Sequence, residues 1–477
     1  MLNLGHFLET LSLSSEGYQP TGDEPAISSV VIDSREAGPG SLFVAFAGEQ
    51  TDGHDYVQAA FDQGAVAALV QRTVPGDHAT IDLCNKNGPD IAPGAAINTP
   101  VCLLVEDTLT ALQTVAKAWR ERFPIRVIGI TGSVGKTSTK ELVYSVLSRR
   151  YRTLKSAGNQ NNEIGLPLTL LKLQRHHQRA VLEMGMYTTG EISRLCELAQ
   201  PEIGVLTIVG PVHLERAGTM EAIVAAKQEL VEALPEYGTA VLNKDDERVM
   251  GMAAHTQASV FTYGLDSSAD LWADNIRSMG LEGVRFTLHH GREAMNVQVP
   301  LLGRHSVHTA LRAAAVGLVD GLTWPEIIAG LSETKAQLRL VAVPGPNNSL
   351  IIDDTYNSSH DSVMAACNLL KDLDGRHVVV LGDMLELGYM AEPSHRLVGR
   401  RAVDVADVLI TVGQLGRIIG EEALAVGMPA DRVMMVDDAG TAVPLLEELI
   451  QERDVILIKG SLGMRMDRIV AALGRDN

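Results

Sequence analysis

The stretch RVIGITGSVGKTSTKELVYSVL, residues 126–147, decides the fold. Its first part, residues 126–131, is an apolar run typical of a buried strand, and residues 136–147 have the pattern of a helix. A strand that leads through a glycine-rich turn into a helix is the building unit of parallel sheets with crossover helices. The same alternation continues on both sides of this stretch, so we expect an α/β fold.

The turn between that strand and that helix carries a phosphate-binding pattern. Gly132 and Gly135 let the backbone curl so that its N–H groups can point at phosphate oxygens. Lys136 adds a positive charge, and Thr137 offers a hydroxyl to Mg²⁺ at the start of the helix. Ile130 stands where the common motif has its first glycine, which leaves the shorter pattern G-x-x-G-K-T. The sequence thus predicts a phosphate site; an ordinary glycine-rich turn is the alternative.

The pattern of strands and helices divides the chain into three parts. With 477 residues the chain is too long for one ordinary hydrophobic core. Short strands and one helical stretch occupy residues 1–106, and parallel α/β patterns occupy residues 107–336 and 337–477. We predict a small N-terminal α/β domain, a central domain with the phosphate loop on a parallel sheet, and a C-terminal Rossmann-like domain.

Composition and charge exclude several classes of protein. The formal net charge of -19 argues against a nucleic-acid surface, because binding to phosphate backbones requires basic stripes. The four cysteines are scattered without C-x-x-C spacing, which is typical of reduced thiols and not of disulfides or a zinc site. No run reaches the roughly 18–20 apolar residues that a membrane helix requires. We expect a cytoplasmic protein without membrane insertion, and a monomer as the default.

Two residues of the central domain are candidates for a metal site. In an open parallel sheet, ligands bind at the carboxyl ends of the strands. Glu183 follows the run AVL and His213 follows LTIVG, so both are expected at that edge, near the phosphate loop. A carboxylate oxygen beside bound phosphate is a ligand that Mg²⁺ prefers. Considered singly, each residue is more often structural or solvated.

Two further features of the central domain have open interpretations. Lys227 lies in an alanine-rich helix, where composition alone favours a surface lysine. The segment GNQNNEIGLP gathers Asn159, Asn161 and Asn162 between glycines. Their amides could donate to phosphate or sugar, but turn chemistry explains such clusters equally well.

The C-terminal domain has polar residues at the ends of several predicted strands. Asp354, Tyr356 and Asn357 follow the run SLIID, and the segments 381–388 (LGDMLELG) and 458–467 (IKGSLGMRMD) lie at the ends of later strands. Each segment alone is a weak signal. Together they indicate that one rim of the C-terminal sheet faces a ligand.

These motifs, taken in order, resemble the Mur ligase family nearly from end to end. The combination of GNxNNxxGxP with LGDMxELG is specific and rarely arises by chance. The matching segments are DSREAGPGSLFVAFAGEQTDGHDYVQAA (33–60), TGSVGKTSTKE (131–141), GNQNNEIGLPLTLL (158–171), LEMGM (182–186) with GEI (190–192), VHLERAGTMEAIVAAKQE (212–229), VLNKDD (241–246), DDTYN (353–357), VVLGDMLELG (379–388) and LIKGS (457–461).

The resemblance implies an activity: ATP-dependent ligation of D-alanyl-D-alanine to UDP-N-acetylmuramoyl-tripeptide, with Mg²⁺, in the synthesis of peptidoglycan precursors. The carboxylate of the nucleotide-sugar peptide would attack the γ-phosphate, and the amine of the dipeptide would then attack the acyl phosphate. Positioning and charge neutralisation supply most of the catalysis in such chemistry.

The resemblance also implies roles for individual residues. Catalysis would rest on Lys136, Glu183, His213 and Lys227, with metal ligands Thr137, Glu183 and His213, and with Lys227 at the position that is carbamylated in relatives. The residues implied for ATP are Thr131, Gly132, Ser133, Val134, Gly135, Lys136, Thr137, Ser138 and His305. Those implied for the other substrates are Ser34 and Arg35, which match the UDP-sugar segment, and Asn159, Asn161, Asn162, Asp354, Tyr356 and Asn357.

The chain departs from the family pattern at three places. Relatives usually have His-Asn-x-x-Asn, tied to adenine recognition, where this chain has HSVHT at 305–309, and often have Tyr-Asn-Ala-Asn-Pro where it has YNSSH at 356–360. Leu462 replaces the arginine usual after KGS, although Arg465 lies close by. A related ligase with a different amine acceptor and a catalytically inactive nucleotide-binding homologue therefore stay open as alternatives.

Other enzyme classes fit the sequence less well. A kinase or GTPase would keep the phosphate loop but would not need the GNQNN segment or a second α/β domain. The segment NKDD at 243–246 resembles a guanine-binding motif, yet its place after TAVL also fits the Mur pattern. A dinucleotide oxidoreductase is disfavoured, because no G-x-G-x-x-G opens either α/β domain.

Overall fold

The computed structural model of the chain describes residues 1–12, 18–48, 51–85, 97–212, 214–333 and 341–474. Contacts between Cα atoms divide it into two compact units, which are described separately. The first unit contains residues 1–127, 152–184 and 193–201, and the second contains residues 128–151, 185–192 and 202–477.

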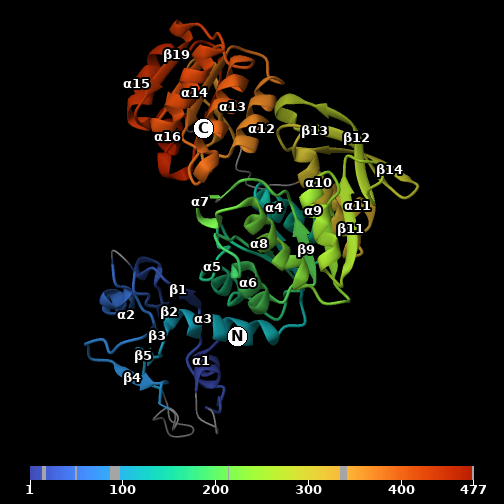
Figure 1. Ribbon diagram of the computed structural model, residues 1–477. Coiled ribbons are helices and arrows are strands. Elements are labelled where there is room, and N and C mark those ends of the chain that lie inside the picture. Colours follow the sequence, from blue (N-terminus) through green and yellow to red (C-terminus); the bar gives the residue numbers. More distant parts are fainter. Residues whose placement is uncertain (13–17, 49–50, 86–96, 213, 334–340, 475–477) are drawn as a thin grey trace. The chain divides into compact units, whose positions relative to one another are not determined.

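The first unit is built on a five-stranded parallel sheet in the order β1-β2-β3-β5-β4 (Figure 1). Its strands are β1 (Ser29–Val31), β2 (Ser41–Val44), β3 (Ala67–Val70), β4 (Ala79–Asp82) and β5 (Val101–Leu104). Strands β2 and β3 are buried along their whole length, which explains why they read as continuous apolar runs. The predicted strands around residues 28–33 and 41–46 are confirmed.

Helices and one more strand pair complete the first unit. The predicted helical stretch after residue 54 is α2 (Val57–Asp62), which packs Val57 and Phe61 against Phe43 of β2. The other helices are α1 (Leu4–Leu11), α3 (Thr108–Glu121), α5 (Gly165–Leu170) and the end of α6 (Glu191–Ala199). Strands β7 (Thr153–Lys155) and β8 (Arg179–Glu183) pair in parallel. The loop predicted at residues 85–100 lies largely outside the described residues.

The first part of the second unit carries strands in the order β14-β13-β12-β11-β10-β9-β6. Their bounds are β6 (Arg126–Thr131), β9 (Ile203–Leu206), β10 (Thr239–Asn243), β11 (Ser259–Gly264), β12 (Leu271–Ser278), β13 (Val284–His290) and β14 (Glu293–Val299). Pairing is parallel from β6 to β12, and β12, β13 and β14 pair antiparallel. Both the parallel sheet and the antiparallel patch agree with the sequence pattern.

Helices follow the parallel strands β6, β9 and β10 in this part of the unit, as crossover connections require. They are α4 (Lys136–Leu147), α7 (Leu214–Ala217), α8 (Met220–Glu232) and α9 (Glu247–Gly251). Two further helices, α10 (Ser306–Val319) and α11 (Trp324–Ser332), come after β14. Helix α10 packs against α4, the helix that follows the phosphate loop. This packing places residues from two distant parts of the sequence beside the loop.

The last part of the second unit is a six-stranded sheet in the order β15-β16-β20-β17-β18-β19. Its strands are β15 (Val341–Pro344), β16 (Leu350–Asp354), β17 (His377–Gly382), β18 (Val408–Val412), β19 (Val433–Val436) and β20 (Val455–Lys459). All neighbouring pairs are parallel except the edge strand β15. Strand β20 lies between β16 and β17, so the carboxyl ends of β16 and β20 are neighbours at the edge of the sheet where ligands of such folds bind.

Helices cover both faces of this sheet, as the Rossmann-like prediction requires. One core cluster joins alternate strand residues to helices α12 (His360–Leu370), α13 (Ala391–Val403) and α14 (Gln414–Ala425). A second cluster joins the remaining strand residues to α15 (Ala439–Leu449) and α16 (Asp467–Leu473). The five helices appear in orange to red in Figure 1.

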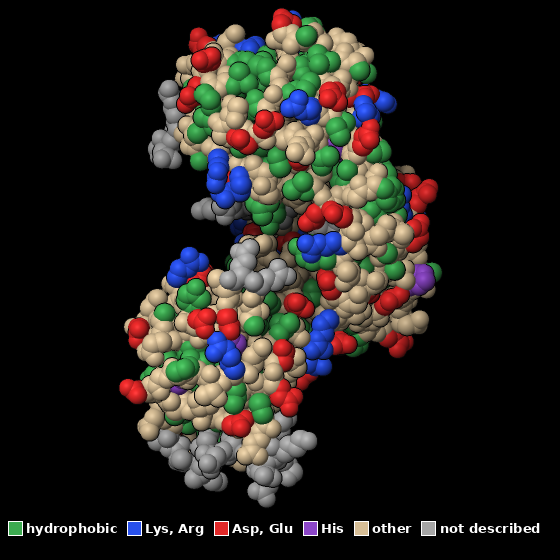
Figure 2. Space-filling model, turned by 60° about the vertical axis from the view of Figure 1, so that its left-hand side comes forward, with side chains coloured by type: hydrophobic (Ala, Val, Ile, Leu, Met, Phe, Trp, Pro, Cys, Tyr) green, Lys and Arg blue, Asp and Glu red, His purple; other side chains and the backbone are tan. Residues whose placement is uncertain are grey.

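Figure 2 shows acidic and basic side chains interspersed over the visible face, without a basic stripe. Among the described residues, no helix is both long and apolar enough to cross a membrane.

Candidate active site

The glycine-rich turn forms a loop between a buried strand and a helix. Strand β6 ends at Thr131, and α4 begins at Lys136. Gly132 has φ of 144° and Gly135 has φ of 86°, a region that residues with a Cβ rarely adopt. A Cβ on Gly132 would overlap the hydroxyl of Thr207. The two glycines are therefore required by both backbone conformation and space.

Hydrogen bonds to the end of the neighbouring strand hold the loop in place. Ser133 donates from its backbone N–H to the carbonyl of Ile208 over 2.7 Å, and its hydroxyl bonds both the N–H and the carbonyl of Gly210, each over 2.9 Å. Lys136 Nζ donates to the carbonyl of Gly132 over 2.7 Å. The loop is thus preorganised, with its ammonium group held over its own backbone.

We expect Gly132→Ala to lower the free energy of unfolding by about 1–3 kcal/mol and to weaken nucleotide binding, because the new methyl group displaces the loop from Thr207. Urea denaturation and titration with ADP measure the two effects. Gly291→Ala is the matched control, since Gly291 also has positive φ but has nothing within 4 Å of a Cβ. Equal losses of stability and ADP affinity in both variants would show that the positive φ, and not the contact with Thr207, causes the effect.

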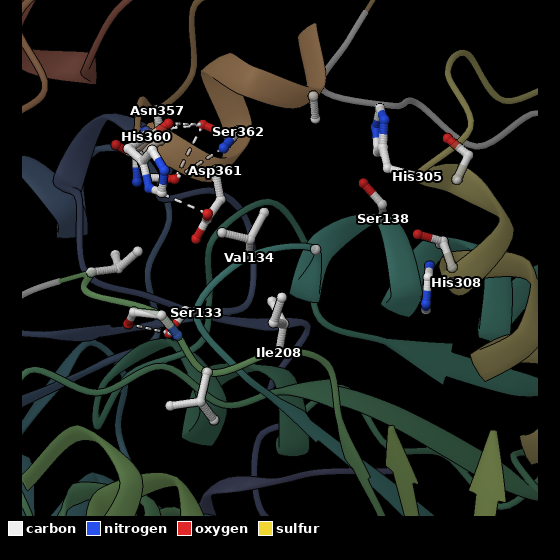
Figure 3. A pocket seen from close by; sticks show the side chains of 18 of the residues that line it. Ser133, Val134, Ser138, Ile208, His305, His308, Asn357, His360, Asp361 and Ser362 are labelled. Carbon is white, nitrogen blue, oxygen red and sulfur yellow. Dashed lines mark hydrogen bonds and ion pairs between the residues drawn. The ribbon is translucent and has the colours of Figure 1, made fainter. Parts of the chain in front are cut away.

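The loop forms one wall of a cavity of about 910 Å³ within the second unit. Other walls come from the segment 208–212, from α10 and the residues before it, and from the start of α12. In Figure 3, His360 and Asp361 of α12 lie on one side of Val134, and His305 and His308 lie on the other. Of the predicted residues, the wall contains Ser133, Val134, Gly135, Thr137, Ser138, His305, Asp354 and Asn357. A volume of this size suits a nucleotide.

One end of the cavity carries a histidine–aspartate pair. His308 Nε2 lies 2.7 Å from Asp245 Oδ2, and Asp245 also accepts hydrogen bonds from the N–H groups of Leu265 and Asp266. Burial alone would raise the pKa of Asp245, but these hydrogen bonds together lower it. In the NKDD segment, Asn243 donates to the carbonyl of Thr207, so this amide ties two strand ends together.

The rim of the C-terminal sheet contributes a buried ion pair to the same cavity. Lys459 Nζ lies 2.7 Å from Asp354 Oδ2 and donates to the carbonyl of Asn357 over 2.8 Å. Lys459 is only 1% exposed, so its charge is compensated by these two partners. Tyr356 lies beside this group but not in the cavity wall. His305 faces the cavity, and its enclosure by the surrounding protein lowers its pKa.

Lys227 is buried, unlike the surface lysine that composition favours. Its exposed fraction is 3%, and it lies on α8. Burial is the main cause that lowers its pKa well below the usual value, and the charge of Lys136 lowers it further. Because burial and the neighbouring charge favour the uncharged form of this amine, Lys227 is better suited than a surface lysine to lysine chemistry such as carbamylation.

The remaining predicted residues lie in the first unit or outside the described residues. Glu183, 1% exposed at the end of β8, accepts a hydrogen bond from Asn161 Nδ2 over 3.0 Å. Asn162 Oδ1 accepts the N–H of Gly165 over 2.8 Å, which is turn chemistry. Asn159 lies on a turn of this unit, and Ser34 begins a short 3-10 helix (Ser34–Glu36). Exposed Arg35 pairs with Asp33 over 2.6 Å. His213 lies outside the described residues.

The donors present suit Mg²⁺ better than a transition metal. No group of three or more His, Cys, Asp or Glu side chains that could hold a metal occurs in the described ranges. Thr137 offers a hydroxyl at the start of α4, and Glu183 offers a carboxylate; both are hard oxygen donors. Mg²⁺ usually takes few protein ligands and completes its shell with phosphates and water, so oxygen donors of either kind suit this ion.

Several residues of the cavity wall were given no role from the sequence, among them Asp245, His308 and Arg312. Asp245 belongs to the NKDD segment, which resembles a guanine-binding motif and also fits the Mur pattern. Arg312 does have a signal, since it interrupts the apolar helix TALRAAAVGLV, where a charge is out of place.

Comparison with known proteins agrees with this arrangement. Three family models match successive segments: the Mur ligase family catalytic domain at residues 26–118, the Mur ligase middle domain at 130–317, and the Mur ligase glutamate ligase domain at 338–462. A UDP-N-acetylmuramoyl-tripeptide–D-alanyl-D-alanine ligase from Bacillus subtilis (strain 168) is 36% identical over 95% of this chain and 94% of its own length. The enzyme of that name from Escherichia coli (strain K12) is 34% identical over 95% of each chain.

Solved structures show the same similarity. MurF from Acinetobacter baumannii superimposes with a TM-score of 0.82 at 30% identity, covering 98% of this chain and 97% of that one. MurF ligase from Thermotoga maritima, solved in complex with ADP, has a TM-score of 0.76 at 26% identity, covering 93% and 96%. The three-domain α/β architecture of the prediction is confirmed, and its exact boundaries at residues 106 and 336 stay a prediction. This chain belongs to the Mur ligase family.

Proposed function

We propose that this enzyme uses ATP to join D-alanyl-D-alanine to UDP-N-acetylmuramoyl-tripeptide, giving the pentapeptide, ADP and phosphate. The relatives that match over nearly the full chain carry this activity in their names. The observation that carries the proposal is a single cavity that contains both the phosphate loop and the Asp354–Lys459 pair. Such a cavity brings a triphosphate and a second reactant to one place.

In this reaction the terminal carboxylate of the tripeptide attacks the γ-phosphorus, and the bond to the β,γ-bridging oxygen breaks, which releases ADP. The amine of the dipeptide then attacks the acyl carbonyl, and inorganic phosphate leaves. The N–H groups at the start of α4 and the ammonium of Lys136 would bind the phosphates. The ammonium of Lys459, held by Asp354, would lie near the reacting groups.

Mg²⁺ would be held by Thr137 and Glu183, and His213 stays a predicted ligand. The ion supplies charge neutralisation, since an anionic carboxylate must approach an anionic triphosphate. Carbamylated Lys227 would be an anion that supports the metal site. Burial lowers the pKa of its amine, which favours that modification. The nucleotide-sugar peptide would be contacted by Ser34, Arg35, Asn159, Asn161 and Asn162. A cytoplasmic location and a monomer complete the proposal; four free cysteines support the location.

Phosphate release with ATP and Mg²⁺ tests the proposal when each substrate is omitted in turn. We expect release only when UDP-N-acetylmuramoyl-tripeptide and D-alanyl-D-alanine are both present. Release with the nucleotide and another amine would keep the reaction but replace the acceptor. Binding of ADP without turnover for any amine would identify an inactive homologue.

A further inference from the structure

Arg312 is a buried arginine whose guanidinium lies beside the phosphate loop. It is 5% exposed and projects from α10. Its Nη2 donates to Thr309 Oγ1 over 2.9 Å, and its Nη1 donates to the hydroxyl of Tyr263 over 3.4 Å. Its buried Nε has no hydrogen-bond partner. Both partners are neutral hydroxyls, so neither compensates the positive charge.

No carboxylate of the described chain lies within ion-pair distance of Arg312. The nearby acids are engaged elsewhere: Asp245 binds His308 and two backbone N–H groups, and Asp246 accepts the N–H groups of Val209 and Arg248. A buried charge without an opposite charge is costly, and arginine stays charged at all physiological pH values. The fold thus retains a buried cation for which the described protein offers no anion.

The position of the guanidinium indicates where an anion would bind. A Cβ built on Gly135 would come within 3.2 Å of Arg312 Nη2, so the guanidinium lies directly against the last loop residue before α4. The N-terminus of α4 is itself an anion site, because its first N–H groups have no partners within the helix. Arg312 also belongs to the cavity wall, together with Gly135 and Thr137.

We propose that Arg312 is a nucleotide-phosphate ligand of this enzyme, acting from α10 beside the loop and in addition to Lys136. The inference rests on the proposed use of ATP. The buried charge of Arg312 is compensated by an anion and not by the neutral adenine base, and the planar guanidinium matches the geometry of phosphate oxygens. Thr309 then has the role of orienting the guanidinium through its hydroxyl.

A series of substitutions separates charge from hydrogen bonding. Arg312→Lys keeps the charge, Arg312→Gln keeps a donor without charge, and Arg312→Met keeps only the apolar stem. With ADP as the probe in calorimetric titration, we expect Arg312→Met and Arg312→Gln to weaken binding by about 10- to 100-fold, because a hydrogen bond to a charged group contributes to affinity by about this factor. Arg312→Lys should retain most of the affinity.

The control and the unfolding of the free protein distinguish this role from a structural one. Arg285→Met removes the same charge from an exposed position on β13 and should leave the affinity for ADP unchanged. Without nucleotide, Arg312→Met should unfold at a temperature no lower than the wild type, because an uncompensated buried charge is removed.

Three results would overturn the inference. Unchanged ADP affinity in Arg312→Met would exclude a ligand role. Higher ADP affinity in Arg312→Gln than in Arg312→Lys would show that Arg312 contacts the adenine base of the nucleotide and not a phosphate. A lower unfolding temperature with unchanged ADP affinity would make Arg312 a structural residue. Wild-type protein that binds no ADP would instead contradict the proposed function itself.

Discussion

We expect Lys136→Ala to lower ATP-dependent phosphate release by roughly 1000-fold, because it removes a charge that acts on the transferring phosphoryl group. The ammonium of Lys136 is held 2.7 Å from the carbonyl of Gly132, within the loop that would receive the phosphates. Initial rates with saturating substrates measure the effect, and circular dichroism verifies that the variant is folded.

Lys371→Ala is the matched control for this prediction. Lys371 is an exposed lysine at the end of α12 and does not line the cavity, so the same loss of charge should leave the rate unchanged. Similar rates in Lys136→Ala and the wild type would mean that the loop does not hold the reacting phosphate.

Lys227→Ala is expected to lower the rate roughly 100-fold, the upper range for residues that support a metal site without binding it. The physical reason is charge: a carbamate at this position supplies an anion beside Lys136, whereas alanine supplies none. Addition of a short carboxylate such as acetate should restore part of the activity of the alanine variant. Lack of any restoration, together with an unmodified Lys227 in the mass spectrum of the active enzyme, would contradict the carbamate role.

The unmodified Lys227 also predicts how stability changes with pH. Its pKa is lowered in the folded state and is ordinary, about 10.4, in the unfolded state. Between these two values the unfolded state binds more protons, so the free energy of unfolding rises with pH. In buffer free of CO₂, urea midpoints should therefore rise as the pH increases towards 10, and Lys227→Met should remove part of this slope. An identical slope in the variant would show that Lys227 does not titrate on unfolding.

The sequence by itself determined the α/β class, the three successive domains and the phosphate loop. These features depend on residues that are neighbours along the chain: an apolar run, two glycines at fixed spacing and a helix starting at Lys136. The antiparallel patch after β12 was also predictable, because alternation of apolar and polar residues reports a sheet with one exposed face.

Only the tertiary structure decided which side chains meet around the cavity. Lys227 and Arg312 both lie on alanine-rich helices, and nothing in their local sequence says that each is buried beside the same loop. The pair of His308 with Asp245 joins residues 63 positions apart. Burial and charge compensation arise from packing between distant segments, and this packing sets the pKa of Lys227 and leaves Arg312 without a carboxylate. The chemistry of the site therefore depends on contacts that local sequence patterns do not encode.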